Sequence, residues 1–462
     1  MIIPKLRNSA ILVILCLFWL LPIPDLMAQW SVPKKLQTQV NNLTSEQRTF
    51  VTSGEILNFI PERQLKHELE SRDADSLHSL IDDLMTLARK MKYDAKRDMG
   101  AAPLNLTSKY FNRRQPTAAP LRDLERKPGP FSVHRYLFPQ SGVPTFGGAK
   151  IAIWPEDLVA GNVDVAIIGV PNNLSSGRRD AGQSPDAMRA LNTIATADMQ
   201  SLLKPLEVLS VVDYGNFSVN GLSTERTVNH VTDMVAETAE TGSIPMLVGG
   251  DTSMLYPGVK GIAKVHGSGK FGLLHFSAHP DAERFGDHTI SDRQAMFLLL
   301  DQNIVKGRDT IQVGLRGPDL DVKTLQWLRD KKVRYHTMAE IQKRGFNKVL
   351  KRVLREVKKG PDAFFVSIDV SVIDPTDMVA AGRITANGLD IASVTRAIRH
   401  VCASKQIVGF EITDMAPMMD LSRLSVLNSN AILNACLVGI AVRKAGFDPT
   451  YIHPLALNHG SR

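Results

Sequence analysis

Cysteine is scarce in this chain, which has three in 462 residues. Cys16 lies inside an apolar N-terminal run, so only Cys402 and Cys436 remain for the rest of the chain. Two cysteines cannot build a disulfide framework, and the absence of C-x-x-C excludes the commonest redox motif and the usual zinc motifs. We therefore expect two buried free thiols. The sequence also lacks G-x-S-x-G, the turn that presents the serine of many hydrolases.

A strong excess of one charge is also missing. The net charge is +8, the pI is about 9.3, and 22% of residues are charged against 44% hydrophobic, which is an ordinary globular composition. The densest basic stretch, residues 89–97, ends a helical pattern and is interpreted as a solvated face. We therefore predict no nucleic-acid partner. No internal repeat is present.

The N-terminus carries the features of a targeting segment. Lys5 and Arg7 precede an apolar run from Ala10 to Leu21, which is too short to span a membrane comfortably. We predict a signal peptide over residues 1–28 and export to a periplasm or the exterior. Leu26 is large for the position three residues before the cleavage point, so an uncleaved membrane anchor stays open as the alternative.

Two further regions follow. Residues 29–130 are predicted to form a helical extension and a linker, because Ser76–Met91 has the apolar spacing of one helix face and five prolines interrupt the later part. Residues 131–462 alternate short apolar runs with amphipathic segments such as Ser223–Thr241 and Asn347–Lys359. The predicted strands are 163–170, 209–215, 244–250, 271–279, 310–317, 363–370 and 406–413.

This alternation predicts an α/β fold with three layers, in which helices cover both faces of a mainly parallel sheet. Ligand sites in such sheets lie at the carboxyl ends of the strands. The polar residues at these ends are Asp251, Thr252, Ser277, His279, Asp281, Asp369, Ser371 and Asp414.

Strand geometry brings some of these side chains together. Ser277 and His279 are two residues apart and point to one side of a strand end, as do Asp369 and Ser371. With Asp281 from the following loop, one His and two carboxylates could hold one divalent ion. The alternative for any single residue is that it caps the next helix.

Seven ordered motifs resemble the ureohydrolase superfamily, which contains arginase, agmatinase, guanidinobutyrase and guanidine hydrolase. They are GVPTFGG (142–148), GVPNN with SPDAMR (169–173 and 184–189), GGDT (249–252), SAHPD (277–281), SIDVSVIDP (367–375), VAAGRITANGL (379–389) and GFEITDMAP (409–417). The resemblance implies the fold of that superfamily, of the agmatinase-like branch, for residues 131–462.

The resemblance also implies a metal site. These enzymes hold two manganese ions, sometimes nickel, on four Asp and two His, and a bridging hydroxide attacks the guanidinium carbon to release urea. Carried over to this sequence, the ligand positions are Thr252, Ser277, His279, Asp281, Asp369 and Ser371. His279, Asp281 and Asp369 keep a ligand, so we expect at most one manganese or nickel ion.

Two other residues take roles from the resemblance. Asp414 stands at the position of the acidic residue that contacts the substrate guanidinium, and His288 lies near a proton-shuttling or substrate-contacting His. A polar loop residue is the alternative interpretation of His288. Asn173 replaces an expected Asp.

We therefore hold two hypotheses. The first is a catalytically impaired ureohydrolase homologue that acts as a binding or partner subunit. The alternative is an exported amidinohydrolase acting on a small guanidino compound, such as agmatine, guanidinobutyrate or guanidine, with a reduced or unusual metal site. The superfamily's trimers and hexamers suggest a homo-oligomer, or a hetero-oligomer with an active paralogue.

Overall fold

The structure is a computed structural model. It describes residues 30–92, 126–134, 142–173, 180–191, 197–221, 223–284, 290–318, 320–458 and 460. The chain divides into two compact units, Met1–Lys92 and Tyr93–Arg462, and each is described by itself. The predicted boundary after residue 28 lies outside the described residues, whereas the one after residue 130 lies within the described stretch 126–134. Both boundaries stay predictions.

The described part of the first unit is a small helical bundle. Its helices are α2 (Gln37–Asn41), α3 (Ser45–Thr52), α4 (Glu62–Ser71) and α5 (Ala74–Met91). Thr44 and Gln47 form a capping box at the start of α3, and the Asp73 carboxylate accepts from Ser76 N–H at the start of α5. The apolar faces enclose a separate core around Leu65 and Ile81. The predicted helix Ser76–Met91 is confirmed as α5.

The second unit is built on a nine-stranded sheet in which every paired strand is parallel. The strand order is β1-β3-β2-β4-β9-β8-β5-β6-β7. The strands are β1 (Lys150–Ile151), β2 (Val165–Gly169), β3 (Val211–Asn216), β4 (Ile244–Val248), β5 (Gly272–Phe276), β6 (Thr310–Leu315), β7 (Arg334–Thr337), β8 (Ala363–Asp369) and β9 (Gln406–Thr413).

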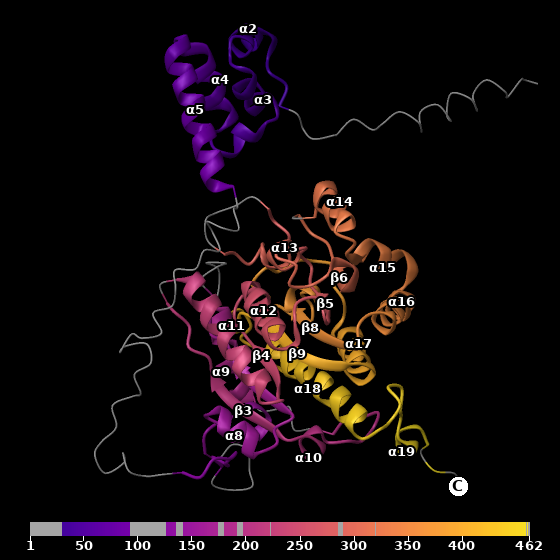
Figure 1. The fold of residues 1–462 in the computed structure, drawn as a ribbon. Helices are drawn as coiled ribbons and strands as arrows, with labels where there is room; N and C mark the ends of the chain where they lie inside the picture. The colour runs from indigo at the N-terminus through magenta and orange to yellow at the C-terminus, as the bar shows by residue number, and fades with distance from the viewer. Residues whose placement is uncertain are drawn as a thin grey trace, which may run out of the picture. The chain divides into compact units, whose positions relative to one another are not determined.

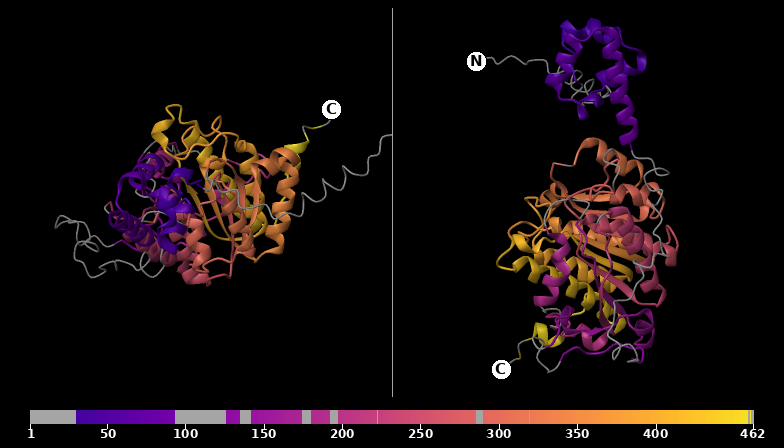
Figure 2. Two further views of the ribbon diagram at one scale, coloured as in Figure 1. Left: turned by 90° about the horizontal axis from the view of Figure 1, so that it is seen from above. Right: turned by 90° about the vertical axis from the view of Figure 1, so that its left-hand side faces the viewer.

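Helices lie on both sides of this sheet (Figures 1 and 2). One core cluster joins the sheet to α9 (Ser184–Leu191), α15 (Met338–Arg344), α16 (Phe346–Lys359), α17 (Ile391–Ser404) and α18 (Leu424–Lys444). A second cluster joins the sheet to α8 (Pro155–Ala160), α11 (Thr224–Glu240), α12 (Leu255–His266), α13 (Ala295–Asp301) and α14 (Val322–Asp330). The short helix α10 (Pro205–Val208) packs Leu206 and Val208 against the first cluster, and α19 (Pro454–Leu457) contributes to neither. The predicted three-layer α/β/α fold is confirmed.

All seven predicted strands are present, but the sequence did not predict β1 or β7. The first has two residues, and the second, Arg334–Thr337, is polar and lies at the edge of the sheet. Edge strands are commonly short or polar, because an apolar exposed edge would pair with other chains. Their sequences therefore lack the apolar run that marked the central strands.

The prediction of two free thiols is wrong. Cys402 on α17 and Cys436 on α18 form a disulfide, with Cα atoms 5.3 Å apart. The two helices pack against each other over their length, and this packing brings together cysteines that are 34 residues apart in the sequence. Spacing along the chain gave no sign of this contact.

α18 is the one described helix that is long and apolar enough to cross a membrane. Its apolar window is 83% buried inside the unit, so we interpret it as the core helix of the domain.

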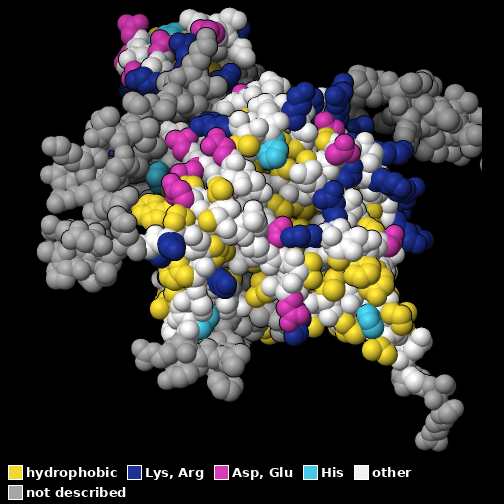
Figure 3. Space-filling view, turned by 60° about the horizontal axis from the view of Figure 1, so that its bottom comes forward, with side chains coloured by type: hydrophobic (Ala, Val, Ile, Leu, Met, Phe, Trp, Pro, Cys, Tyr) yellow, Lys and Arg dark blue, Asp and Glu magenta, His cyan; other side chains and the backbone are white. Residues whose placement is uncertain are grey.

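Positive charge is unevenly distributed over the second unit. The exposed side of α16 carries Lys348, Lys351, Arg352, Arg355, Lys358 and Lys359. Lys and Arg side chains gather on the right-hand edge in Figure 3, the side on which Figure 1 places α15 and α16.

Candidate functional site

The polar residues at the strand ends converge, as the sequence predicted. Asp251 and Thr252 follow β4, Asp369 ends β8, and Asp414 follows β9. Ser277, His279 and Asp281 follow β5, and Ser371 lies in the turn η7 (Val370–Val372) after β8. All eight side chains are buried, with at most 4% of any residue exposed. In the strand order, β4, β9, β8 and β5 are consecutive, so these ends meet at the centre of the sheet.

The centre of this cluster is occupied by a residue that the sequence analysis missed. Arg383 comes from the loop between η7 and α17, and 8% of it is exposed. Its Nη1 lies 2.7 Å from Asp281 Oδ1, and its Nη2 lies 2.9 Å from Asp369 Oδ2. The same Nη2 donates to Thr252 Oγ1 at 2.9 Å. The guanidinium therefore links the ends of three strands.

Two more carboxylates face this guanidinium at longer range. Asp292 Oδ2 is 3.5 Å from Arg383 Nε, and Asp414 Oδ2 is 4.0 Å from it. Burial disfavours a charged guanidinium, but Asp281, Asp369, Asp414 and Asp292 outweigh burial and raise the pKa of Arg383 well above its usual range. Arg383 is therefore a permanent cation at this site.

The carboxyl groups respond in two ways. Burial opposes ionisation of Asp281, yet the neighbouring Arg383 lowers the pKa of Asp281 below its usual value. Burial, together with the charge of Asp369, raises the pKa of Asp414 well above its usual value, and burial also raises that of Asp292. The cluster thus favours ionisation of Asp281, which pairs with Arg383, and disfavours ionisation of Asp414 and Asp292.

The hydroxyl residues are engaged within the cluster. Ser277 Oγ donates to Asp369 Oδ2 at 2.9 Å and accepts from His279 N–H at 2.9 Å. Ser371 Oγ accepts from Ala278 N–H at 3.3 Å. These contacts satisfy neighbouring groups, and they leave Asp369 with an arginine, a serine and a threonine around one carboxylate oxygen.

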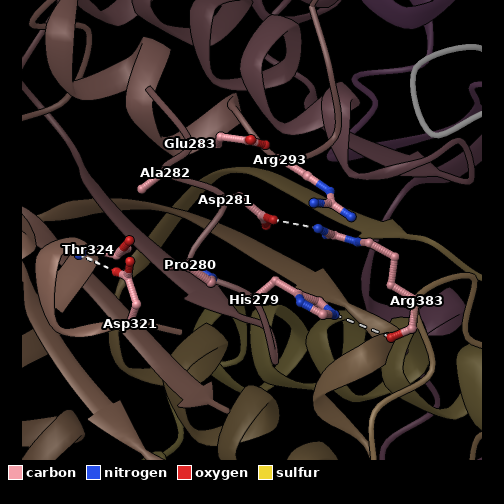
Figure 4. A pocket seen from close by; sticks show the side chains of 9 residues that line it. All are labelled: His279, Pro280, Asp281, Ala282, Glu283, Arg293, Asp321, Thr324 and Arg383. Atoms are coloured by element: carbon pink, nitrogen blue, oxygen red, sulfur yellow. Dashed lines mark hydrogen bonds and ion pairs between the residues drawn. The ribbon is translucent and has the colours of Figure 1, made fainter. Parts of the chain in front are cut away.

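His279 faces the loop that carries Arg383. Its Nε2 lies 3.3 Å from the Arg383 carbonyl oxygen (Figure 4). The same nitrogen lies 3.3 Å from Thr385 Oγ1. In the tautomer with hydrogen on Nε2, the ring donates to that carbonyl. His279 thus fixes the backbone of the same residue whose side chain pairs with Asp281.

A small hollow opens beside this cluster, with a cavity volume of about 200 Å³. Its lining comprises His279, Pro280, Asp281, Ala282, Glu283, Arg293, Asp321, Thr324 and Arg383 (Figure 4). In Figure 4 the guanidinium of Arg383 points to Asp281 near the middle of the view, so a molecule in the hollow would meet an ion pair already formed.

A buried polar chain lies under the site and was also missed by the sequence analysis. His275, Ser367 and Glu411 are in register on β5, β8 and β9. Ser367 Oγ donates to Glu411 Oε1 at 2.6 Å, and His275 contacts Ser367 Oγ at 2.9 Å and Asp281 Oδ2 at 3.4 Å. Burial raises the pKa of Glu411 to about 8. Polar residues within otherwise apolar strands are the sequence signal for such a chain.

Asp414, His288 and the predicted metal ligands are the other site residues that the sequence suggested. Asp414 reaches the cluster, where its Oδ2 accepts from Arg383 N–H at 2.8 Å. His288 lies outside the described residues. Within the described part of the chain, no three His, Cys, Asp or Glu are arranged to hold a metal ion. The metal role of His279, Asp281 and Asp369 therefore stays a prediction.

A profile of the arginase family matches residues 163–438, more than half of the chain. The chain belongs to the arginase family. Formimidoylglutamase of Bacillus subtilis is 24% identical over 293 residues, covering 63% of this chain and 90% of that protein. Guanidinobutyrase of Pseudomonas aeruginosa is 25% identical over 317 residues, covering 65% and 96%.

The solved structures agree on the fold. Proclavaminate amidino hydrolase from Streptomyces clavuligerus superposes with a TM-score of 0.60 at 20% identity, covering 66% of this chain and 98% of that one. Arginase-family proteins generally bind manganese and are typically oligomeric. The ureohydrolase resemblance and its fold are thereby confirmed for the second unit.

Proposed function

We propose that this arginase-family chain does not assemble the metal pair of its relatives, does not hydrolyse guanidino compounds, and acts as a binding or partner subunit. One observation carries the proposal. The two carboxylates that remain at the ligand positions, Asp281 and Asp369, are both ion-paired to Arg383, at 2.7 and 2.9 Å. The family's chemistry requires those carboxylates for metal.

Charge supports the proposal. Two divalent ions bring about four positive charges, which the family offsets with four carboxylates. Asp281 and Asp369 supply two negative charges, and Arg383 already neutralises one of them. Ser277 and Ser371 supply hydroxyls, which are weak ligands for a divalent ion. The donor set therefore does not fit a metal pair.

The second part of the proposal is export. The apolar run Ala10–Leu21 motivates a cleaved leader, with an uncleaved membrane anchor as the alternative. The disulfide between Cys402 and Cys436 supports this, because disulfides persist mainly in oxidising compartments.

The third part concerns partners. Relatives are typically oligomeric, and we propose that this chain forms a homo-oligomer, or a hetero-oligomer with a catalytically active paralogue. Purification of the tagged chain from its native host, followed by light scattering and mass spectrometry, tests this. A monomeric chain that co-purifies with no other member of the family would contradict the role as a partner subunit.

The decisive test of function measures metal and urea on the purified mature chain. We expect less than one manganese or nickel per chain after dialysis, and no urea from agmatine, guanidinobutyrate or guanidine. A stable content near two ions per chain, with urea release on the order of one per second or faster, would refute the proposal.

A further inference from the structure

Three side-chain acceptors surround the terminal nitrogens of Arg383, whereas its Nε makes no hydrogen bond within the described part of the chain. A guanidinium is planar and presents five N–H donors in a fixed fork, whereas an ammonium or a metal ion is compact. Here the two terminal nitrogens address carboxylates that follow different strands, Asp281 after β5 and Asp369 on β8. Thr252, after β4, accepts a further hydrogen bond from Nη2. The acceptors thus surround a flat cation from several directions.

The backbone that carries Arg383 is tied to the same cluster. Arg383 N–H donates to Asp414 Oδ2 at 2.8 Å, and Gly382 N–H donates to the Asp414 carbonyl at 2.7 Å. A Cβ at Gly382 would lie 2.4 Å from Asp414 Oδ1, so glycine allows this close passage.

A second arginine secures the far side of the loop. Arg316 Nη2 donates to the carbonyls of Thr385 at 2.7 Å and Ser371 at 2.8 Å, and its Nε donates to that of Ala386 at 2.7 Å. The loop is therefore held to the turn after β8 independently of the Arg383 side chain. Removal of that side chain should leave the surrounding acceptors in place.

We propose that the strand-end cluster is a guanidinium-binding site whose resident ligand is the chain's own Arg383, and that it accepts a small guanidinium ion from solution once that side chain is removed. The class of ligand is a planar monovalent guanidinium, in preference to a divalent metal ion or an alkylammonium. This inference deepens the proposed function and rests on one part of it, namely that Asp281 and Asp369 pair with Arg383 in the parent chain and do not bind a metal ion.

The test uses the full mature chain carrying Arg383→Ala. Thermal unfolding is followed while methylguanidinium, methylammonium, urea or manganese chloride is titrated at constant ionic strength. We expect the variant to unfold below the parent, and methylguanidinium at 100 times its Kd to raise the midpoint of the variant by about 3 °C, saturably. The parent should not respond, because Arg383 fills its site. Urea, a neutral molecule of similar shape, and methylammonium should have no such effect.

Two further variants serve as controls. Val394→Ala, a cavity substitution in buried α17, should lower the midpoint without any response to methylguanidinium. Adding Asp369→Asn to Arg383→Ala should abolish the response, since it removes one of the two carboxylates that pair with the ligand.

If Arg383→Ala does not fold, Arg383→Lys keeps a cation without the planar fork. Its midpoint should lie below that of the parent, and a midpoint equal to or above the parent would overturn the proposal. Stabilisation of Arg383→Ala by manganese and not by methylguanidinium would also overturn it. Two manganese ions bound to the parent chain would instead refute the proposed function, so the two failures are distinguishable.

Discussion

Placing the family's ligand types at the positions implied by the resemblance should not be sufficient to form a metal site while Arg383 remains. Thr252→His, Ser277→Asp and Ser371→Asp together return one imidazole and two carboxylates to the ligand positions implied by the resemblance. Arg383 would still pair with Asp281 and Asp369 at 2.7 and 2.9 Å. We therefore expect this triple variant to bind little manganese, and a quadruple variant that adds Arg383→Ala to bind two ions per chain.

The expected changes in unfolding free energy are large enough to measure. Two carboxylates about 4 Å apart repel by about 4 kcal/mol at an effective dielectric constant of about 20. The metal-free quadruple variant places four carboxyl groups at the implied ligand positions without a cation, so it should lose at least the roughly 3–5 kcal/mol typical of a broken buried ion pair. Manganese at 1,000 times its Kd contributes about 4 kcal/mol per ion, or about 8 kcal/mol for two.

These energies convert to temperature through the unfolding entropy. At about 2.1 cal/mol/K per residue, residues 93–462 give about 0.8 kcal/mol/K, so saturating manganese should raise the midpoint of the quadruple variant by about 10 °C. The triple variant should rise far less. Metal content after gel filtration and thermal unfolding with and without manganese measure both effects.

Urea release from agmatine, guanidinobutyrate and guanidine then reports on chemistry. We expect measurable release from the quadruple variant alone. Equal manganese content in the triple and quadruple variants would refute the reasoning about Arg383. Two bound ions without hydrolysis would place further damage in Asp414, Asn173 or the loop 379–389.

Three further outcomes are expected. Burial raises the pKa of Glu411 to about 8, so its contribution to stability is full below about pH 4.5 and is lost as the pH rises towards 8. The unfolding free energy of Glu411→Gln, measured with urea, should therefore rise relative to that of the parent between these pH values. A difference that does not change with pH would count against this. Replacing Cys402 and Cys436 by Ala should cost about 2–4 kcal/mol of unfolding free energy, whereas free thiols in the unreduced, denatured parent would show that the disulfide does not form. N-terminal sequencing of protein from the native host should begin near Gln29, and an intact Met1 would contradict cleavage.

The fold was predictable because its central strands are buried on both faces. Runs such as 163–170 and 363–370 must be apolar to lie between two helical layers, so they stand out in the sequence. β1 and β7 escaped because edge strands do not need such runs. The disulfide escaped for another reason: the contact between Cys402 and Cys436 follows from helix packing, which spacing does not encode.

The sequence predicted where the candidate site lies but did not predict that Arg383 is part of it. Parallel strands end at one edge, so Ser277, His279 and Asp369 could be assigned to one cluster from their positions alone. Arg383 could not, because the direction of a loop side chain depends on tertiary contacts such as those of Arg316. The charges offered one signal, because buried carboxylates need a positive charge nearby. Arg383 supplies such a charge and lies in the motif 379–389.

The residues at the ligand positions that the resemblance implies are consistent with one another. Under that assignment, Ser277 and Ser371 leave two of the four carboxylates, and Arg383 supplies a single positive charge beside the remaining two. The high pKa values favoured for Asp414 and Asp292 move the cluster further in the same direction. Two of the hydroxyls belong to the Arg383 assembly: Thr252 Oγ1 accepts from Arg383, and Ser277 Oγ donates to Asp369. A site that had merely decayed would leave Asp281 and Asp369 buried without a counter-charge, and this one supplies the counter-charge from its own loop.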